Sequence, residues 1–167
     1  MSAATMPYSS LGAGAASRLI RAGLFTGVSD AVWAMVLQVF IYHRGSAGSV
    51  WRGVASVLIG KGAITGGAPA TVLGLVMHFG VAFAWSAIFL LLVTRSPWLR
   101  AILDSPYGVL KVAAVYGPFI WAFMSFIFIP MFTHHLPTVT INWWIQAAGH
   151  MLFVGLPLVA SIGSGSR

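Results

Sequence analysis

Four stretches of this sequence are long, apolar and almost devoid of charged residues, and they restrict the fold more than any other feature. They cover residues 19–42, 69–93, 108–132 and 141–163. A membrane-spanning helix needs about 20 predominantly apolar residues, and each stretch meets that length. We therefore predict an all-α integral membrane protein: a four-helix bundle in a single transmembrane domain, residues 18–163. A flexible lead (1–17) and a short tail (164–167) complete the predicted organisation.

The composition excludes a soluble globular domain. Hydrophobic residues make up 59% of the chain and charged residues 7%, whereas about a quarter of an ordinary soluble protein is charged. The net charge of +7 comes from nine basic residues that flank the apolar stretches. A nucleic-acid site needs a contiguous basic patch, which is not found here. We expect the lipid bilayer as partner, leave open another membrane protein, and expect no nucleic acid.

The sequence also lacks the residue sets of common enzyme sites. It has no cysteine, which removes thiolate nucleophiles and cysteine-bound metals. Asp30 and Asp104 are the two acidic residues, and their positions do not suggest a paired-carboxylate site. No nucleophile elbow, P-loop or dinucleotide fingerprint occurs. We predict a non-enzymatic protein, an accessory or structural component of the membrane.

The segment between the first two spans, residues 46–67, is too short and interrupted to cross a bilayer. Ser49, Arg52 and Ser56 fall on one helical face, and valines with Leu58 fall towards the other. This pattern is typical of a short helix at the membrane interface. A loop helix packed on the bundle would show the same pattern, so both alternatives stay open.

Basic residues predict the orientation, because cytoplasmic loops are enriched in lysine and arginine. With four spans, both termini and the second loop share one side. That side carries six basic residues: Arg18, Arg21, Arg95, Arg100, Lys111 and Arg167. The opposite side carries three: Arg44, Arg52 and Lys61. We therefore predict both termini in the cytoplasm.

Three ionisable residues lie in the predicted spans at similar depth. Asp30, His78 and His150 each fall near the midplane, on helical faces that carry small or polar residues. Because such groups are costly in hydrocarbon, we expect all three to converge on one polar site inside the bundle. Pro118 lies near the same depth and predicts a helix kink beside that site, since proline frees the Ala114 carbonyl.

Three roles are open for this polar site. The favoured one is packing, in which hydrogen bonds between the helices fix the bundle. The second is a proton- or cation-linked transport site built around Asp30, His78 and His150. The third is axial ligation of haem b by His78 and His150, in an electron carrier. The packing role, which we favour, needs no cofactor.

A second group of histidines is expected at the outer interface. His43, His134 and His135 lie in or beside the predicted outer loops. Three imidazoles could bind a metal ion or respond to pH. Histidines in a solvated loop are more often ordinary polar surface, and this is the interpretation we prefer.

Several motifs give the chain a resemblance. The runs GVSDAVWA, SVWRGVASVLIGKGAITGG, TVLGLVMHFGVAFAW and GHMLFVGLPL resemble a group of short bacterial four-helix membrane proteins of unknown function. The likeness extends over most of residues 27–157, while the aromatic run WAFMSFIFIP departs from it. The resemblance implies the bacterial inner membrane as location and implies no chemistry.

Overall fold

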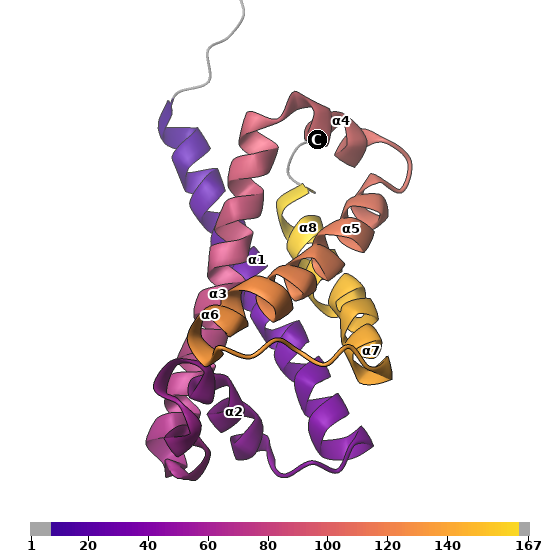
Figure 1. Cartoon of the computed structure of the whole chain (residues 1–167). Coiled ribbons are helices and arrows are strands. Elements are labelled where there is room, and N and C mark those ends of the chain that lie inside the picture. The colour runs from indigo at the N-terminus through magenta and orange to yellow at the C-terminus, as the bar shows by residue number, and fades with distance from the viewer. Residues whose placement is uncertain (1–7, 164–167) are drawn as a thin grey trace, which may run out of the picture.

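The computed structural model describes residues 8–163, and within that range every regular element is helical. Four helical rods are long and apolar enough to cross a membrane: Gly14–Ile41, Gly67–Arg95, Gly108–Thr133 and Ile141–Gly163. The four predicted spans are thereby confirmed to within a few residues. An all-α four-helix bundle of this kind fits a multi-pass membrane protein (Figure 1).

Three of the four rods are not continuous α-helices. The second rod is α3 alone, Gly67–Arg95. The other three contain a π-helical segment, in which each turn takes up an extra residue. The first rod is α1 (Tyr8–Met35) with η1 (Val36–Ile41); the third is α5 (Gly108–Phe123), η3 (Met124–Phe128) and α6 (Ile129–Thr133); the fourth is α7 (Ile141–His150), η4 (Met151–Gly155) and α8 (Leu156–Gly163).

Helix α1 starts earlier than the sequence predicts. It begins at Tyr8, so residues 8–17 of the predicted lead belong to the first turns of α1. A run of small residues such as Gly and Ala has no hydrophobic periodicity from which a helix could be predicted, although alanine itself favours helices. Residues 1–7 and the predicted tail, 164–167, lie outside the described residues.

Three short helices connect the rods. Helix α2 spans Ala47–Ile59, the 3₁₀-helix η2 spans Lys61–Thr65, and α4 spans Pro97–Asp104. Helix α2 starts with a capping box, in which Ser49 Oγ accepts the Ser46 N–H at 2.9 Å. Helix α4 starts with Pro97 after Ser96, whose side chain accepts the Leu99 N–H at 3.1 Å. Local caps therefore define where both helices begin.

Helix α2 packs on the bundle. A side chain at Gly74 of α3 would collide with the Trp51 backbone carbonyl, so the two helix backbones touch there. Arg52 Nε donates to the Ile64 carbonyl at 2.9 Å and ties α2 to η2. Packing of this segment on the bundle, the second of the two interpretations, is therefore what the structure shows (Figure 1).

The four rods form a ring. Neighbouring rods are joined in it either by close approach of their backbones or by large side chains. Helix α1 packs against α3 on one side and against η4 and α8 on the other, while α5 packs against α7, η4 and α8. At Gly117 of α5, an added side chain would collide with the His150 backbone, so these backbones touch. Helices α3 and α5 instead meet through large side chains, including Trp85 and Tyr116, whose O–H donates to the Trp85 carbonyl at 3.1 Å.

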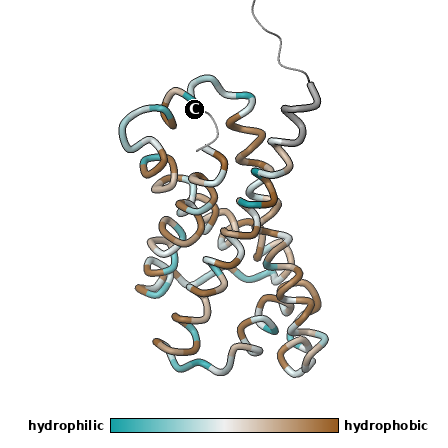
Figure 2. The backbone as a smooth tube through the Cα atoms, turned by 180° about the vertical axis from the view of Figure 1, so that it is seen from behind, coloured by the Kyte–Doolittle hydropathy of each residue, from teal (hydrophilic) through white to brown (hydrophobic). Residues whose placement is uncertain are grey.

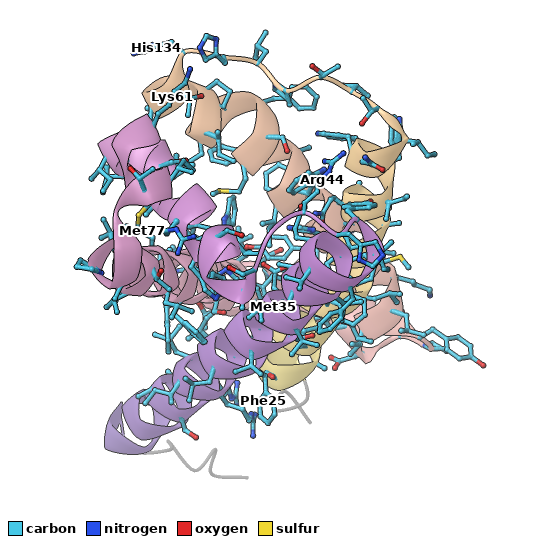
Figure 3. All side chains as sticks on the ribbon, turned by 90° about the horizontal axis from the view of Figure 1, so that it is seen from below. Phe25, Met35, Arg44, Lys61, Met77 and His134 are labelled. Atoms are coloured by element: carbon cyan, nitrogen blue, oxygen red, sulfur yellow. The ribbon has the colours of Figure 1, made fainter. Side chains whose placement is uncertain are left out.

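Many large apolar side chains lie on the outer surface. Phe25, Phe40 and Val115, for example, are 61%, 67% and 71% exposed. Figure 3 draws the side chains around the rods, with Phe25 labelled. Hydrophobic residues run along the rods, and hydrophilic ones gather at the ends and connections (Figure 2). This distribution is the one that lipid contact requires, because bare apolar surface of this extent is rare on soluble monomers.

Candidate functional site

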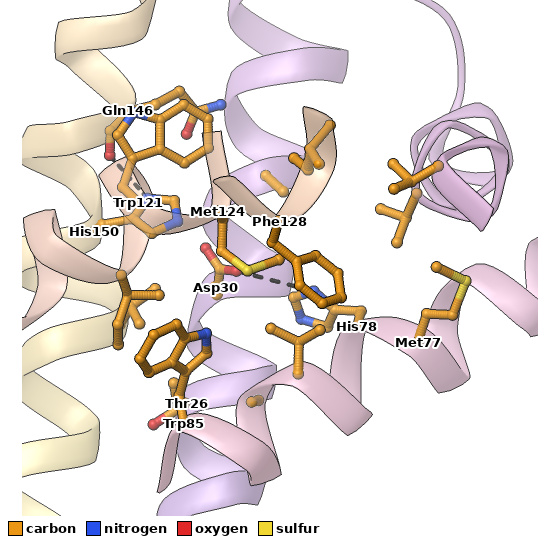
Figure 4. A pocket seen from close by; sticks show the side chains of 18 of the residues that line it. Thr26, Asp30, Met77, His78, Trp85, Trp121, Met124, Phe128, Gln146 and His150 are labelled. Carbon is orange, nitrogen blue, oxygen red and sulfur yellow. Dashed lines mark hydrogen bonds and ion pairs between the residues drawn. The ribbon is translucent and has the colours of Figure 1, made fainter. Parts of the chain in front are cut away.

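The three intramembrane ionisable residues line one cavity of about 230 Å³. Asp30 reaches it from α1, His78 from α3 and His150 from α7 (Figure 4). Side chains of α2, α5, η3, α6 and η4 complete the wall. The structure therefore brings together three residues that lie up to 120 positions apart in the chain.

Asp30 and His78 form the closest contact among the three. Asp30 Oδ2 lies 3.9 Å from His78 Nδ1, within ion-pair range but longer than a direct hydrogen bond. The other ring nitrogen of His78, Nε2, lies 2.8 Å from the Gly27 carbonyl oxygen. Since a carbonyl oxygen can only accept, Nε2 carries a hydrogen and Nδ1 is the nitrogen that faces the carboxyl group.

His150 is held by its own helix. Its Nδ1 lies 2.8 Å from the Gln146 carbonyl oxygen, one turn earlier, so Nδ1 is the donor. The side chain is 9% exposed, and its ring centroid lies 4.7 Å from that of Trp121. Because Nδ1 is occupied, Nε2 is the nitrogen left available for other partners.

Glycines make this close arrangement possible. Gly27 and Gly23 of α1 face the rings of Phe79 and Phe83 on α3, where any side chain would collide. The absent side chain at Gly27 lets α3 approach until His78 reaches the Gly27 carbonyl. Residues 23–27, GLFTG, thus carry a small-xxx-small pair that packs two helices of the same chain.

The Asp30–His78 pair has room for one shared proton. With Nε2–H donated to Gly27, a neutral His78 presents Nδ1 as an acceptor, so Asp30 must be protonated to bond with it. A protonated His78 instead presents a donor, and Asp30 is then ionised. In both arrangements the pair holds one shared proton and carries no net charge. Loss of that shared proton leaves a negative charge on the pair, inside the bundle.

Two further polar groups at the cavity were not predicted. Thr26 is 2% exposed, and neither its Oγ1 nor the buried Nε1 of Trp121 has a hydrogen-bond partner in the described part of the chain. Both residues line the cavity. Thr26 could have been found from sequence, because it lies four residues before Asp30 and hence on the same helical face. Trp121 carried no comparable signal.

Pro118 is not part of the cavity wall. Helix α5 continues through it, and the wall is formed further along by Ile120, Trp121 and Met124. Two departures from α-helical geometry border the site: η3, which begins at Met124, and η4, which begins at Met151. The kink at Pro118 stays a prediction.

The outer histidines do not form a metal-binding group in the described part of the chain. No group of three or more histidine, cysteine, aspartate or glutamate side chains within residues 8–163 is placed to hold a metal ion. His43 and His134 both adopt a left-handed backbone, with φ of 50° and 57°, where one helix ends and a connection begins. Their positions follow from those separate helix ends, and the metal site formed with His135 is not found.

Comparison with known proteins adds no relative. Scans against protein-family models, curated proteins and solved structures each found no match to this chain. The resemblance to short bacterial four-helix proteins stays a prediction, and the site has to be interpreted from its own geometry.

Proposed function

We propose that this chain is a non-enzymatic, proton-linked transport protein of the bacterial inner membrane, with Asp30 and His78 as its proton-binding pair. The observation that carries the proposal is the 3.9 Å approach of Asp30 Oδ2 to His78 Nδ1 inside the cavity, while His78 Nε2 is bonded to Gly27. This geometry favours proton exchange over simple packing as the role of the polar site. A packing bond needs no second titratable nitrogen, yet His150 lines the same cavity.

The energetics support proton binding. A charged residue at the centre of a membrane helix costs about 2.5–3.5 kcal/mol on insertion scales. A hydrogen bond between membrane helices returns about 0.6 kcal/mol on average. One bond therefore does not offset an unpaired Asp30 carboxylate, and a shared proton, which removes the net charge, is the less costly state. Release of that proton has to be coupled to another change at the site.

The haem alternative has less support from the geometry. An axial histidine must present a free nitrogen to the iron. His78 directs Nε2 at the Gly27 carbonyl and Nδ1 at Asp30, so neither nitrogen is free. We propose no cofactor for this chain.

Infrared spectroscopy can follow the shared proton directly, because Asp30 and Asp104 are the two acidic side chains. In lipid, Asp104→Asn should keep a protonated-carboxyl band that disappears with rising pH, and Asp30→Asn should lose it. Proton flux into liposomes should fall to background in Asp30→Asn and persist in Asp104→Asn. If the Asp104→Asn band does not respond to pH, the proton-binding pair is refuted. Absence of flux, together with stable co-purification of another membrane protein, would support an accessory role instead.

A cysteine introduced at Thr138 tests the proposed orientation. Thr138 lies in the connection between α6 and α7, on the side opposite both termini in a four-span chain. The native chain has no cysteine, so a single label is unambiguous. We expect a membrane-impermeant maleimide to label Thr138→Cys from the periplasmic side. Labelling from the cytoplasmic side alone would reverse the orientation, and Ser96→Cys, in the second loop, provides the complementary control.

A further inference from the structure

The polar cavity adjoins an apolar groove between α3 and the third rod, and the two spaces share part of their walls. This groove has a volume of about 450 Å³, and its wall consists of carbon-rich side chains and Gly80. Six residues line both spaces: Val57, Met77, Val81, Trp85, Met124 and Phe128. The groove lies where α3 meets the third rod through side chains. A molecule dissolved in lipid could therefore enter there without separating helix backbones.

We propose that the cavity and groove together bind a lipophilic cation, with its apolar chain in the groove and its positive group beside Asp30. The inference rests on the proposed proton site and names the substrate class that this site would exchange for its proton. The ligand class follows from charge, from aromatic side chains and from the two-part shape of the space.

Charge favours a cation over an anion or a neutral molecule. The titratable side chains on the wall are Asp30 from α1, His78 from α3 and His150 from α7. Helices α2, α5 and α6 and the segments η3 and η4 contribute no charged side chain to this wall within the described residues. An anion would add a second negative charge beside Asp30, whereas a cation would replace the missing proton and restore neutrality in a low-dielectric site.

Aromatic side chains support the same ligand. Trp51, Trp85 and Trp121 line the cavity, and Trp51 and Trp121 each pack a ring against one of the site's histidines. Indole is the aromatic ring that attracts cations most strongly, and the attraction is greatest where water is excluded. Thr26 Oγ1, buried at the same wall without a partner, can accept a hydrogen bond from a protonated amine.

Proton and cation should therefore compete for one place. With the proton bound, the Asp30–His78 pair is neutral and offers the cation no charge partner. When the proton leaves, the carboxylate is free to pair with the cation. Lowering the pH below the titration of the pair should weaken cation binding by about tenfold per pH unit, as expected for one linked proton.

Binding can be measured with a single-chain quaternary ammonium carrying bromine at the end of its alkyl chain, because bromine quenches tryptophan fluorescence. In lipid nanodiscs at alkaline pH we expect saturable quenching by bromododecyltrimethylammonium. The brominated dodecyl alcohol, of equal chain length and no charge, should give only the non-saturable quenching of lipid partitioning. Asp30→Asn should weaken saturable binding at least tenfold, and acidic pH should do the same to the wild type.

A second pair of variants tests the groove without touching the charge. Gly80 lines the groove, and no atom lies within 4 Å of an added Cβ there. Gly80→Leu should fill the groove and abolish saturable quenching, while Val76→Leu, on the same helix and outside both spaces, should leave it intact.

The outcomes separate the two proposals. Equal quenching by the charged and uncharged probes, or unchanged binding in Asp30→Asn, overturns the cation inference. If the infrared titration of Asp30 is still present in that case, the proton-binding proposal stands alone. If that titration is absent, both fall. Saturable binding that requires Asp30, an open groove and alkaline pH supports the inference.

Discussion

Alanine at Gly117 is expected to destabilise the bundle by at least about 3 kcal/mol, the upper end of overpacking costs. An added Cβ would collide with the backbone carbonyl of His150, and backbone cannot rotate aside as a side chain can. A Cβ added at Gly155, on the facing rod, would likewise meet the Ala113 and Gly117 backbones, so the two rods have no freedom to separate at one point only. Unfolding in mild detergent titrated with SDS, followed by circular dichroism, measures the loss.

Gly80→Ala is the matched control for Gly117→Ala. It makes the same substitution within a membrane-spanning helix, at a position where nothing lies within 4 Å of the new Cβ. Alanine should stabilise that helix by about 0.5–1 kcal/mol, because glycine is the poorer helix former. Equal stability of Gly117→Ala and the wild type would show that α5 and α7 do not touch as described.

Replacing Trp85 with alanine is expected to cost about 3–5 kcal/mol, as for other buried aromatic residues. Trp85 is 8% exposed and packs edge-on against Tyr116, Phe119 and Phe123 of α5. These rings carry the contact between α3 and α5, where no backbone approach replaces them. The loss should appear in the same SDS titration.

Trp98→Ala removes a tryptophan of the same size from an exposed site. Trp98 is 73% exposed, and substitutions at such positions usually change stability by less than about 0.5 kcal/mol. If Trp85→Ala is no more destabilised than Trp98→Ala, the aromatic contact between α3 and α5 does not hold the bundle together.

Sequence reasoning found the fold because the membrane imposes one length and one composition on every span. The apolar stretches at 69–93 and 141–163 correspond to Gly67–Arg95 and Ile141–Gly163 within two residues at each end. The grouping of Asp30, His78 and His150 was predictable for the same reason. Ionisable groups in membrane spans turn away from lipid, so groups at the same depth meet in the interior that the helices share.

What sequence reasoning missed depends on long-range packing. The π-helical segments leave no periodic signal in the sequence. The single extra residue lies in a run of apolar residues and cannot be told apart from its neighbours. The cavity depends on α2 folding back until Trp51 reaches Gly74, which the local pattern left undecided. Thr26 and Trp121 became site residues only once those elements were in place.

The π-helical segment η4 has a further consequence for how substitutions and deletions in the fourth rod should be interpreted. An uninterrupted α-helix turns about 100° per residue, so Leu158, eight positions after His150, would point about 80° away from it. The extra residue taken up by η4 reduces that angle to about 20°, and Ile162 is brought into line in the same way. His150 at the cavity and the fully buried Leu158 and Ile162 thus share one face only because the helix carries an inserted residue. Loss of a single codon within residues 151–155 would leave each half of this rod helical and rotate the site out of phase with the core.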